Sequence, residues 1–333
     1  MALPNSGPLS LNQIHVEAGG SSGSEASIND SDIRGLIGKS SAAQMSFSEW
    51  YGASSVTTIS QTISSSTNNY NIASSRPGTY AAGNTQFTLT VNPGVTIGTN
   101  ATDASSLSMG TPWTSGDTVT INNYGTLKGG GGPGGTGANS GFTSTNAATA
   151  GSTVNGAALT LTYPVTVGNY GSIYGGGGGG GGGGTSTYNQ TFGKLGAAYS
   201  VSGGGGGGGA GVTAGSGGPA GPNNSPVATN NAPLGAGNAG AAGTANSGGA
   251  GGIARGNYSF SGLDFSFTGG AGGGLGSDGS AGQAFVVPPP NSMTNFSSSN
   301  PEAAGAGGTR GYYISGNSYA TWSPQGTVGG RSA

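Results

Sequence analysis

The chain of 333 residues contains no cysteine, one histidine and little charge, since Asp, Glu, Lys and Arg make up only 5% of it. The absence of cysteine excludes disulfides, thiol catalysis and cysteine-based zinc sites, and it fits assembly in a reducing cytosol. The eight basic residues are scattered and the net charge is -2, so binding to nucleic acid is not expected. Neither a signal peptide nor an apolar run long enough for membrane insertion is visible.

Residues that usually carry out chemistry are also sparse. His15 lies beside Glu17 with no second metal ligand nearby, which favours a surface or interface histidine over a zinc site. The serines lie in no Gly-x-Ser-x-Gly elbow. We therefore predict no catalytic residue, cofactor or metal. A polysaccharide-cleaving enzyme would need its carboxylates gathered in one cleft, and those that could serve are isolated along the chain: Asp103, Asp117, Asp264 and Asp278.

Glycine is what the sequence has in excess, with 76 residues and uninterrupted runs at 175–184 and 203–209. Helices and ordinary strands do not tolerate such runs, because glycine loses the most backbone entropy on folding and buries no side chain. One interpretation is a flexible linker. The other is a bundle of polyproline II helices, in which the missing side chain lets neighbouring backbones approach closely and form hydrogen bonds.

An internal repeat favours the ordered interpretation. Residues 119–132 (VTINNYGTLKGGGG) match residues 165–178 (VTVGNYGSIYGGGG), 46 residues further along the chain. Each copy combines a strand pattern, an Asn-Tyr-Gly turn and the start of a glycine run. A flexible linker has no reason to follow a repeated strand-turn unit. We therefore predict ordered glycine rods and keep disorder as the alternative.

Three segments differ in composition. Residues 1–53 carry three short helical turns, residues 54–128 alternate polar and apolar side chains as strands do, and residues 129–333 are rich in glycine. The predicted fold class is mainly β with a glycine-rich polyproline II bundle, a short α-helical segment at the N-terminus and little α structure overall. The predicted helix caps are Ser10 with Gln13, Asn29 or Asp30, and Ser46 with Glu49.

Longer polar and aromatic segments interrupt the glycine tracts of the third segment. If the tracts are antiparallel rods, these interruptions should be loops at their ends, where binding surfaces usually lie. The interruptions span residues 185–202, 222–234, 253–267 and 284–303.

Two features resemble proteins of tailed bacteriophages. Residues 9–19 (LSLNQIHVEAG), 28–38 (INDSDIRGLIG) and 45–52 (MSFSEWYG) resemble the start of many phage tail and fibre proteins. Residues 87–132 resemble the glycine-rich ends of phage host-specificity proteins, and the later tracts resemble the tip adhesins of T-even-like phages. The resemblance implies a non-enzymatic tail fibre or tip adhesin of the virion, assembled in the host cytoplasm. It also implies packed polyproline II helices that present loops to the host, and usually a homotrimer.

On this resemblance, residues 1–53 would attach to tail or baseplate proteins, residues 54–128 would be a stalk or platform, and residues 129–333 would bind a bacterial surface glycan or outer-membrane protein. Those tip adhesins sit on a separate fibre protein, whereas this chain carries its own apparent docking segment. A capsid decoration, collar or head fibre with a purely structural role is the alternative.

Aromatic residues of the interruptions are the candidates for receptor contact, because they supply large contact area at low entropic cost. Alternatively, the aromatic residues cover the open ends of the rods, and the two basic candidates, Lys194 and Arg255, are solvated charges. The receptor-contact candidates are Tyr188, Phe192, Lys194, Tyr199, Arg255, Tyr258, Phe260, Phe265 and Phe296. The candidates for docking to the virion are Leu11, Ile14, Ile33, Leu36, Ile37, Phe47, Trp50 and Tyr51.

Overall fold

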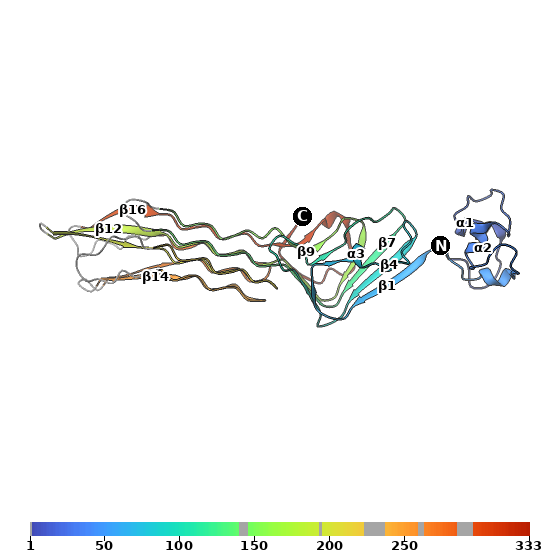
Figure 1. Ribbon diagram of the computed structural model, residues 1–333, viewed down its shortest axis with the longest axis horizontal. Coiled ribbons are helices and arrows are strands. Elements are labelled where there is room, and N and C mark those ends of the chain that lie inside the picture. The colour runs from blue at the N-terminus through green and yellow to red at the C-terminus, as the bar shows by residue number, and fades with distance from the viewer. Residues whose placement is uncertain (1, 140–145, 193–194, 223–236, 259–262, 285–295) are drawn as a thin grey trace. The chain divides into compact units, whose positions relative to one another are not determined.

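The computed structural model describes residues 2–139, 146–192, 195–222, 237–258, 263–284 and 296–333 (Figure 1). The described residues are mainly β, as predicted. Their helices are α1 (Leu11–Glu17), α2 (Ser31–Gly35) and α3 (Ile72–Ser75), with 3-10 turns η1 (Phe47–Trp50) and η2 (Asn317–Tyr319). The chain divides into two compact units. The first contains Met1–Gln61, Ser75–Leu89 and Pro112–Thr120, and the second contains Thr62–Ser74, Thr90–Thr111 and Ile121–Ala333.

Residues 2–55 of the first unit form what we call the N-terminal module. Helix α1 begins with the predicted capping box, in which Ser10 Oγ accepts from the Gln13 N–H and Gln13 Oε1 accepts from the Ser10 N–H. Helix α2 begins after Asp30, whose carboxylate accepts from the Ser27 N–H instead of capping the helix. The predicted Asn29 or Asp30 cap is therefore not formed by a side chain.

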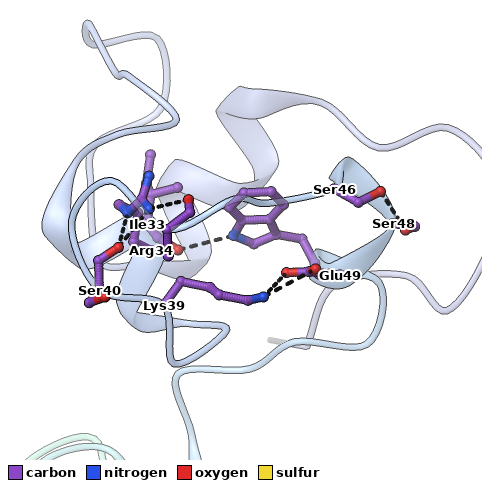
Figure 2. Close-up of polar contacts among 9 residues, drawn as sticks. Ile33, Arg34, Lys39, Ser40, Ser46, Ser48 and Glu49 are labelled. Atoms are coloured by element: carbon purple, nitrogen blue, oxygen red, sulfur yellow. Dashed lines mark hydrogen bonds and ion pairs between the residues drawn. The ribbon is translucent and has the colours of Figure 1, made fainter.

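The predicted capping box at Ser46 is also not formed. Residues Phe47–Trp50 make one 3-10 turn, and Ser46 bonds with the Ser48 hydroxyl instead of a backbone amide (Figure 2). The Glu49 carboxylate pairs with Lys39, with 3.2 Å between the charged atoms. A single short turn offers a capping side chain no full α-helical end to bind, so the two side chains find other partners.

The N-terminal module has its own apolar core. Leu3, Ile14, Ile33 and Trp50 are buried together, and the Trp50 indole N–H donates to the Ile33 carbonyl at 3.0 Å. Complete burial of such a side chain contributes roughly 1.5–3 kcal/mol. These few residues therefore hold together a segment that is otherwise rich in serine and glycine.

Three sheets of five strands each follow the module. The first sheet is ordered β1 (Thr57–Ile63), β4 (Thr85–Val91), β7 (Thr118–Asn123), β10 (Val165–Asn169) and β18 (Ala320–Trp322). The second is ordered β2 (Thr67–Asn68), β5 (Thr96–Gly98), β8 (Thr126–Lys128), β11 (Ser172–Tyr174) and β19 (Thr327–Gly329). The third is ordered β3 (Tyr70–Asn71), β6 (Leu107–Ser108), β9 (Ala157–Thr160), β17 (Tyr312–Ser315) and β20 (Arg331–Ser332).

Each successive coil of the chain supplies one strand to each of these sheets, so the chain winds as a five-coil β-solenoid. All strand pairs of the second and third sheets are parallel. Apolar side chains stack from coil to coil along its interior. In the second sheet, Ile97, Leu127 and Ile173 are aligned by the strand register and are fully buried.

Two long insertions interrupt the solenoid. Residues 129–156 lie between β8 and β9, and residues 175–311 lie between β11 and β17. Together they form what we call the head. The internal repeat of the sequence thus corresponds to two successive coils, each with a strand, a turn, a second strand and the beginning of a glycine tract.

Backbone hydrogen bonds join the glycine tracts of the head. Along residues 177–184, successive N–H groups donate in turn to three neighbouring tracts, and the direction repeats every third residue. The three acceptor tracts are residues 204–210, 277–283 and 149–152; for example, the Gly180 N–H donates to the Gly207 carbonyl at 2.8 Å. The run is therefore a hydrogen-bonded structural element and not a flexible linker.

Most of the predicted loops contain strands. β12 (Thr185–Phe192) pairs with both β13 (Leu195–Val201) and β16 (Phe296–Glu302), and β14 (Ile253–Tyr258) pairs with β15 (Leu263–Thr268), all antiparallel. The loop prediction was wrong for these segments, because their aromatic and β-branched residues favour strands. Of the interruption at 222–234, only residue 222 lies among the described residues. β12, β14 and β16 lie together at the end of the tracts away from β9 (Figure 1).

Candidate functional site

At many positions the glycine tracts of the head approach one another too closely to leave room for a side chain. A Cβ built on Gly180 would collide with the Gly270 carbonyl oxygen, and one on Gly206 would collide with the Gly180 carbonyl oxygen. Neither glycine has a positive φ, so close approach, and not backbone conformation, requires glycine here. Glycine is therefore what allows the tracts to bond directly to one another.

Side chains in the head appear where a tract faces solvent. In the tract 211–222, Gly215, Gly218 and Gly221 are buried, whereas Thr213, Ser216, Pro219 and Pro222 are exposed. The buried hydrophobic side chains of the described head are few: Ala138, Val154, Ala210, Ala254 and Phe267. The head is thus held mainly by backbone hydrogen bonds between its tracts, which satisfy the buried N–H and C=O groups.

The sequence-predicted contact residues fall on those strands. The strand register places Tyr188 opposite Tyr199, and it places Phe296 opposite Gln190. Phe192 ends β12, Arg255 and Tyr258 lie on β14, and Phe265 lies on β15 opposite Gly256. Lys194 and Phe260 lie outside the described residues. Three segments that are far apart in sequence thus bring seven of the nine candidates to strands at one end of the head.

Most predicted docking residues lie inside the N-terminal module. Ile14, Ile33 and Trp50 have no exposed surface, and Leu11, Leu36 and Ile37 pack against them. The prediction that Ile14, Ile33 and Trp50 contact a partner conflicts with this burial, because helical periodicity identifies a core face and a docking face equally. Tyr51 donates its hydroxyl to the Gly7 carbonyl at 2.6 Å. Phe47 remains 41% exposed.

Sequence reasoning missed three features of the module and the solenoid. Val16 is 45% exposed on α1, and its position off the apolar face of the helix could have signalled this. Arg34 is buried, and no pattern in a single sequence predicts the burial of this arginine. Tyr124 and Tyr170 stack with ring centroids 4.7 Å apart and are about half exposed. The internal repeat predicts a turn at each tyrosine but not their contact.

His15 is buried, which contradicts the surface alternative of the predicted surface or interface histidine. Its Nε2 lies 2.8 Å from Ser24 Oγ, and a Cβ built on Gly20 would collide with its ring. The close turn at Gly20 covers the imidazole ring. Within the described ranges, no group of three His, Asp or Glu side chains could hold a metal ion.

Asp117 anchors a turn. Its carboxylate accepts from the N–H groups of Gly83, Thr85 and Thr114 and from the Tyr80 hydroxyl. Burial alone would raise the pKa of Asp117, but these hydrogen bonds outweigh burial and hold its pKa below the ordinary value. A carboxylate engaged in this way stabilises the chain reversal before β7 and is not free to act as an acid or base.

Glu17 is likewise a carboxylate held by hydrogen bonds, in the N-terminal module. Burial would raise its pKa, but hydrogen bonds from the Ser55 N–H and the Ser54 hydroxyl help to lower its pKa below the ordinary value. The carboxylate thereby fixes the chain where it leaves the module. Asp278 accepts from the Arg310 N–H at 2.8 Å. Each of these carboxylates has its own structural partners.

Comparison with known proteins identifies the family. A protein-family model for phage tail fibre adhesin Gp38 matches residues 58–333, which is most of the chain and includes the solenoid and the head. Neither the curated proteins nor the solved structures gave a match. None of the described helices has the length and apolar character needed to cross a membrane. The chain therefore belongs to the phage tail fibre adhesin Gp38 family.

Proposed function

We propose that this chain is a receptor-binding adhesin of a phage tail, and that the end of its head formed by β12–β16 is the surface that contacts the host cell. The observation that carries the proposal is the convergence of three distant segments on one end of a hydrogen-bonded head. Its mechanism is binding without chemistry. The tail location follows from the family, and several copies in one virion would add avidity to weak single contacts.

We further propose that the glycine tracts are polyproline II helices. This helix has three residues per turn and no internal hydrogen bonds. In a β-strand the backbone groups point to two sides, whereas successive N–H groups of residues 177–184 use three directions in turn. Both the three-residue period and the absence of positive φ in this run support the assignment. Backbone φ and ψ from a crystal structure would test it.

The N-terminal module is proposed to attach the chain to the tail or baseplate. It has its own core, it lies outside the family match, which begins at residue 58, and it exposes Val16 and Phe47. A module that is separate from the adhesin family and has exposed apolar residues is suited to docking on another protein. The homotrimer expected from the resemblance remains part of this proposal, and light scattering of the purified chain tests it.

Adsorption measurements test the contact surface. Phage carrying Tyr188→Ala with Tyr199→Ala, a pair that faces across β12 and β13, should assemble normally and adsorb at least about tenfold more slowly, since aromatic residues dominate binding hot spots. The control is Tyr170→Ala on the solenoid, which should adsorb normally. Normal adsorption by the double variant would overturn the proposal. That result is the one expected if the chain is a decoration protein with no receptor role. If these aromatics instead only close the ends of the tracts, the purified variant will melt at lower temperature.

A further inference from the structure

Strands β14 and β15, which we call the hairpin, extend directly from two glycine tracts of the head. β14 begins after Gly252, and β15 ends before Gly269. The Gly269 N–H donates to the Gly252 carbonyl at 2.9 Å, and the pairing continues into the hairpin with Ile253 opposite Thr268. The hairpin is therefore an extension of the hydrogen-bonded tracts beyond their glycines.

The neighbouring tracts support only the root of the hairpin. The Asn238 N–H donates to the Ile253 carbonyl at 3.1 Å, and the Gln283 N–H donates to the Thr268 carbonyl at 2.8 Å. Beyond these residues, β14 and β15 form a sheet of two strands. A two-stranded hairpin is at best marginally stable in water. Its position on the head therefore depends on the side chains that pack at its root.

Phe267 is buried at this root. It is 3% exposed, and the strand register pairs it with Ala254, which is fully buried. Among the buried hydrophobic side chains of the described head, Phe267 is the largest, and the others are alanines and one valine. An aromatic ring removes a large apolar area from water when it is buried. Phe267 therefore anchors a hairpin that neighbouring backbone groups hold only at its first pair.

The buried ring also distinguishes the two faces of the hairpin. Successive residues of a strand lie on opposite faces, and residues paired across two strands share a face. Ser266 is exposed although its neighbour Phe267 is buried, and Ile253 is 36% exposed although its neighbour Ala254 is buried. One face of the hairpin therefore packs on the head, and the other is open to solvent.

The strand register shows that the two faces differ in composition. The pairs on the face of Phe267 contain no polar residue except the Tyr hydroxyl: Ala254 with Phe267, Gly256 with Phe265, and Tyr258 with Leu263. The pairs that share the face of Ser266 are polar: Arg255 with Ser266, and Asn257 with Asp264. This alternation is typical of paired strands with one buried and one solvated face. In the hairpin it favours aromatic residues that close the end of the tracts over aromatic residues that contact a receptor.

From this arrangement we propose that Phe267 is a positioning residue, which anchors the hairpin by its apolar face so that the polar face contacts a glycan of the host surface. This inference rests on the proposed function. Arginine donates hydrogen bonds, aspartate accepts them, and asparagine and serine do both. Sugar hydroxyl groups are donors and acceptors at once, so they can satisfy this mixed set. An apolar protein surface would leave the same groups without partners.

Hydrogen exchange on the full chain tests the anchor. Phe267→Ala should raise the exchange rates of the β14 and β15 amides at least about tenfold and leave residues 177–184 protected. Phe267→Leu keeps an apolar side chain and should restore most of the protection. The matched control is Val154→Ala, which truncates the other buried side chain larger than alanine in the described head and should leave the hairpin protected. Unchanged exchange of the hairpin in Phe267→Ala would overturn the anchor.

Adsorption tests which face contacts the host. Phage carrying Arg255→Ala with Asp264→Ala, which leaves the net charge unchanged, should adsorb at least about tenfold more slowly while the hairpin keeps its protection. Phe267→Ala should also slow adsorption, and Phe267→Leu should restore it. Val154→Ala should adsorb normally, as should Ala281→Ser at an exposed position of the head. Normal adsorption by the polar-face variant, or equal slowing by Phe267→Ala and Val154→Ala, would contradict the proposal.

Competition tests the class of ligand. Polysaccharide extracted from the host envelope and freed of protein by protease should block adsorption of the unmodified phage. Its affinity for the purified chain should fall at least about tenfold in Arg255→Ala with Asp264→Ala, because several hydrogen bonds are lost together. If this polysaccharide does not block adsorption, the glycan assignment is wrong. Inhibition by the envelope protein fraction would then assign the contact to a protein.

Two double variants separate this inference from the proposed function. If Arg255→Ala with Asp264→Ala adsorbs normally while Tyr188→Ala with Tyr199→Ala adsorbs slowly, the polar face of the hairpin is not a contact and the proposed receptor surface stands. If both double variants adsorb normally, the proposed receptor surface fails as well.

Discussion

The side-chain amide of Asn123 donates a hydrogen bond of 2.8 Å to the side-chain oxygen of Asn169 in the next coil of the solenoid. Both side chains are fully buried. The Asn169 amide in turn donates to the carbonyls of Gln325 and Thr327 in the last coil, at 2.6 and 3.1 Å. A ladder of amides therefore joins three coils at the turn between the first and second sheets, and it explains why asparagine recurs in the repeat.

Replacing Asn169 with alanine should destabilise the solenoid by about 2–4 kcal/mol. The change removes the Asn169 donor from the Gln325 and Thr327 carbonyls and leaves the Asn123 amide only its longer bond of 3.3 Å to the Ser172 carbonyl. An unsatisfied buried group costs about 1–3 kcal/mol. Guanidinium unfolding followed by hydrogen exchange of β10 and β11 measures the loss. The control is the neighbouring Tyr170→Ala, which removes a stacked but 54% exposed ring and should cost at most about 1.5 kcal/mol. Equal losses for the two variants would contradict a special role for the ladder.

Acid should weaken the turn held by Asp117. Because its pKa is lowered in the folded chain, the carboxylate contributes stability above its unfolded-state pKa of about 4. That contribution is lost as the pH falls through the folded-state pKa. Hydrogen exchange of residues 81–85 between pH 7 and pH 3, corrected for the intrinsic rate, should show protection decreasing below about pH 4.

Two substitutions isolate the contribution of Asp117. Asp117→Asn should lower protection of the turn at pH 7 and remove most of its acid dependence. Tyr80→Phe deletes only the hydroxyl that lies 2.6 Å from the carboxylate, so it should produce a smaller loss of about 0.5–1.5 kcal/mol. The matched control is Asp103→Asn, which removes an exposed carboxylate of the same chain. An acid dependence that persists in Asp117→Asn would assign the effect to another group.

Arg34 should tolerate no substitution in the N-terminal module, not even lysine. Its buried guanidinium donates to the Ser40 carbonyl, the Ala43 carbonyl and Asn29 Oδ1 (Figure 2 shows the Ser40 side of this arrangement). A lysine ammonium cannot reproduce these diverging donors. We expect Arg34→Lys to destabilise the module by about 2–4 kcal/mol, measured by hydrogen exchange of α1 and α2.

The control for Arg34 is the nearby ion pair of Lys39 and Glu49. Both side chains are about one third exposed, and exposed pairs contribute about 1 kcal/mol or less. Lys39→Ala should therefore cost less than Arg34→Lys although it removes a whole charge. A larger loss from Lys39→Ala would show that the carbonyl cradle around Arg34 is not what orders this segment.

Local patterns in the sequence were enough to predict several elements. The Ser10 capping box, the strands that end at Asn123 and Asn169, and hydrogen-bonded glycine tracts all follow from interactions between residues close in the chain or from an obvious repeat. The solenoid was not predicted, because strands such as β2 and β3 have only two residues and carry no readable period. Their pairing is set by coils many residues apart.

The candidate site was predicted in outline and not in detail. Aromatic composition identified the segments around Tyr188 and Tyr258 as candidates for receptor contact. It did not predict that they form antiparallel strands at one end of the head. In the N-terminal module, the apolar pattern could not separate buried Ile33 from exposed Phe47. That separation depends on how the short helical turns pack together, which three helices of this length do not specify on their own.

The exposed apolar residues of the module lead to the last prediction. Phe47→Ser and Val16→Ser each remove an apolar side chain that is more than 40% exposed, so the module should remain folded with little change in stability, within about 0.5–1 kcal/mol. If these side chains contact a tail protein, virions should incorporate the variants at a reduced level, measured by quantitative immunoblotting of purified particles. The matched control is Ser41→Ala, an exposed position in the same module. Normal incorporation of both variants, with hydrogen exchange confirming a folded module, would mean that attachment uses a different surface of the chain.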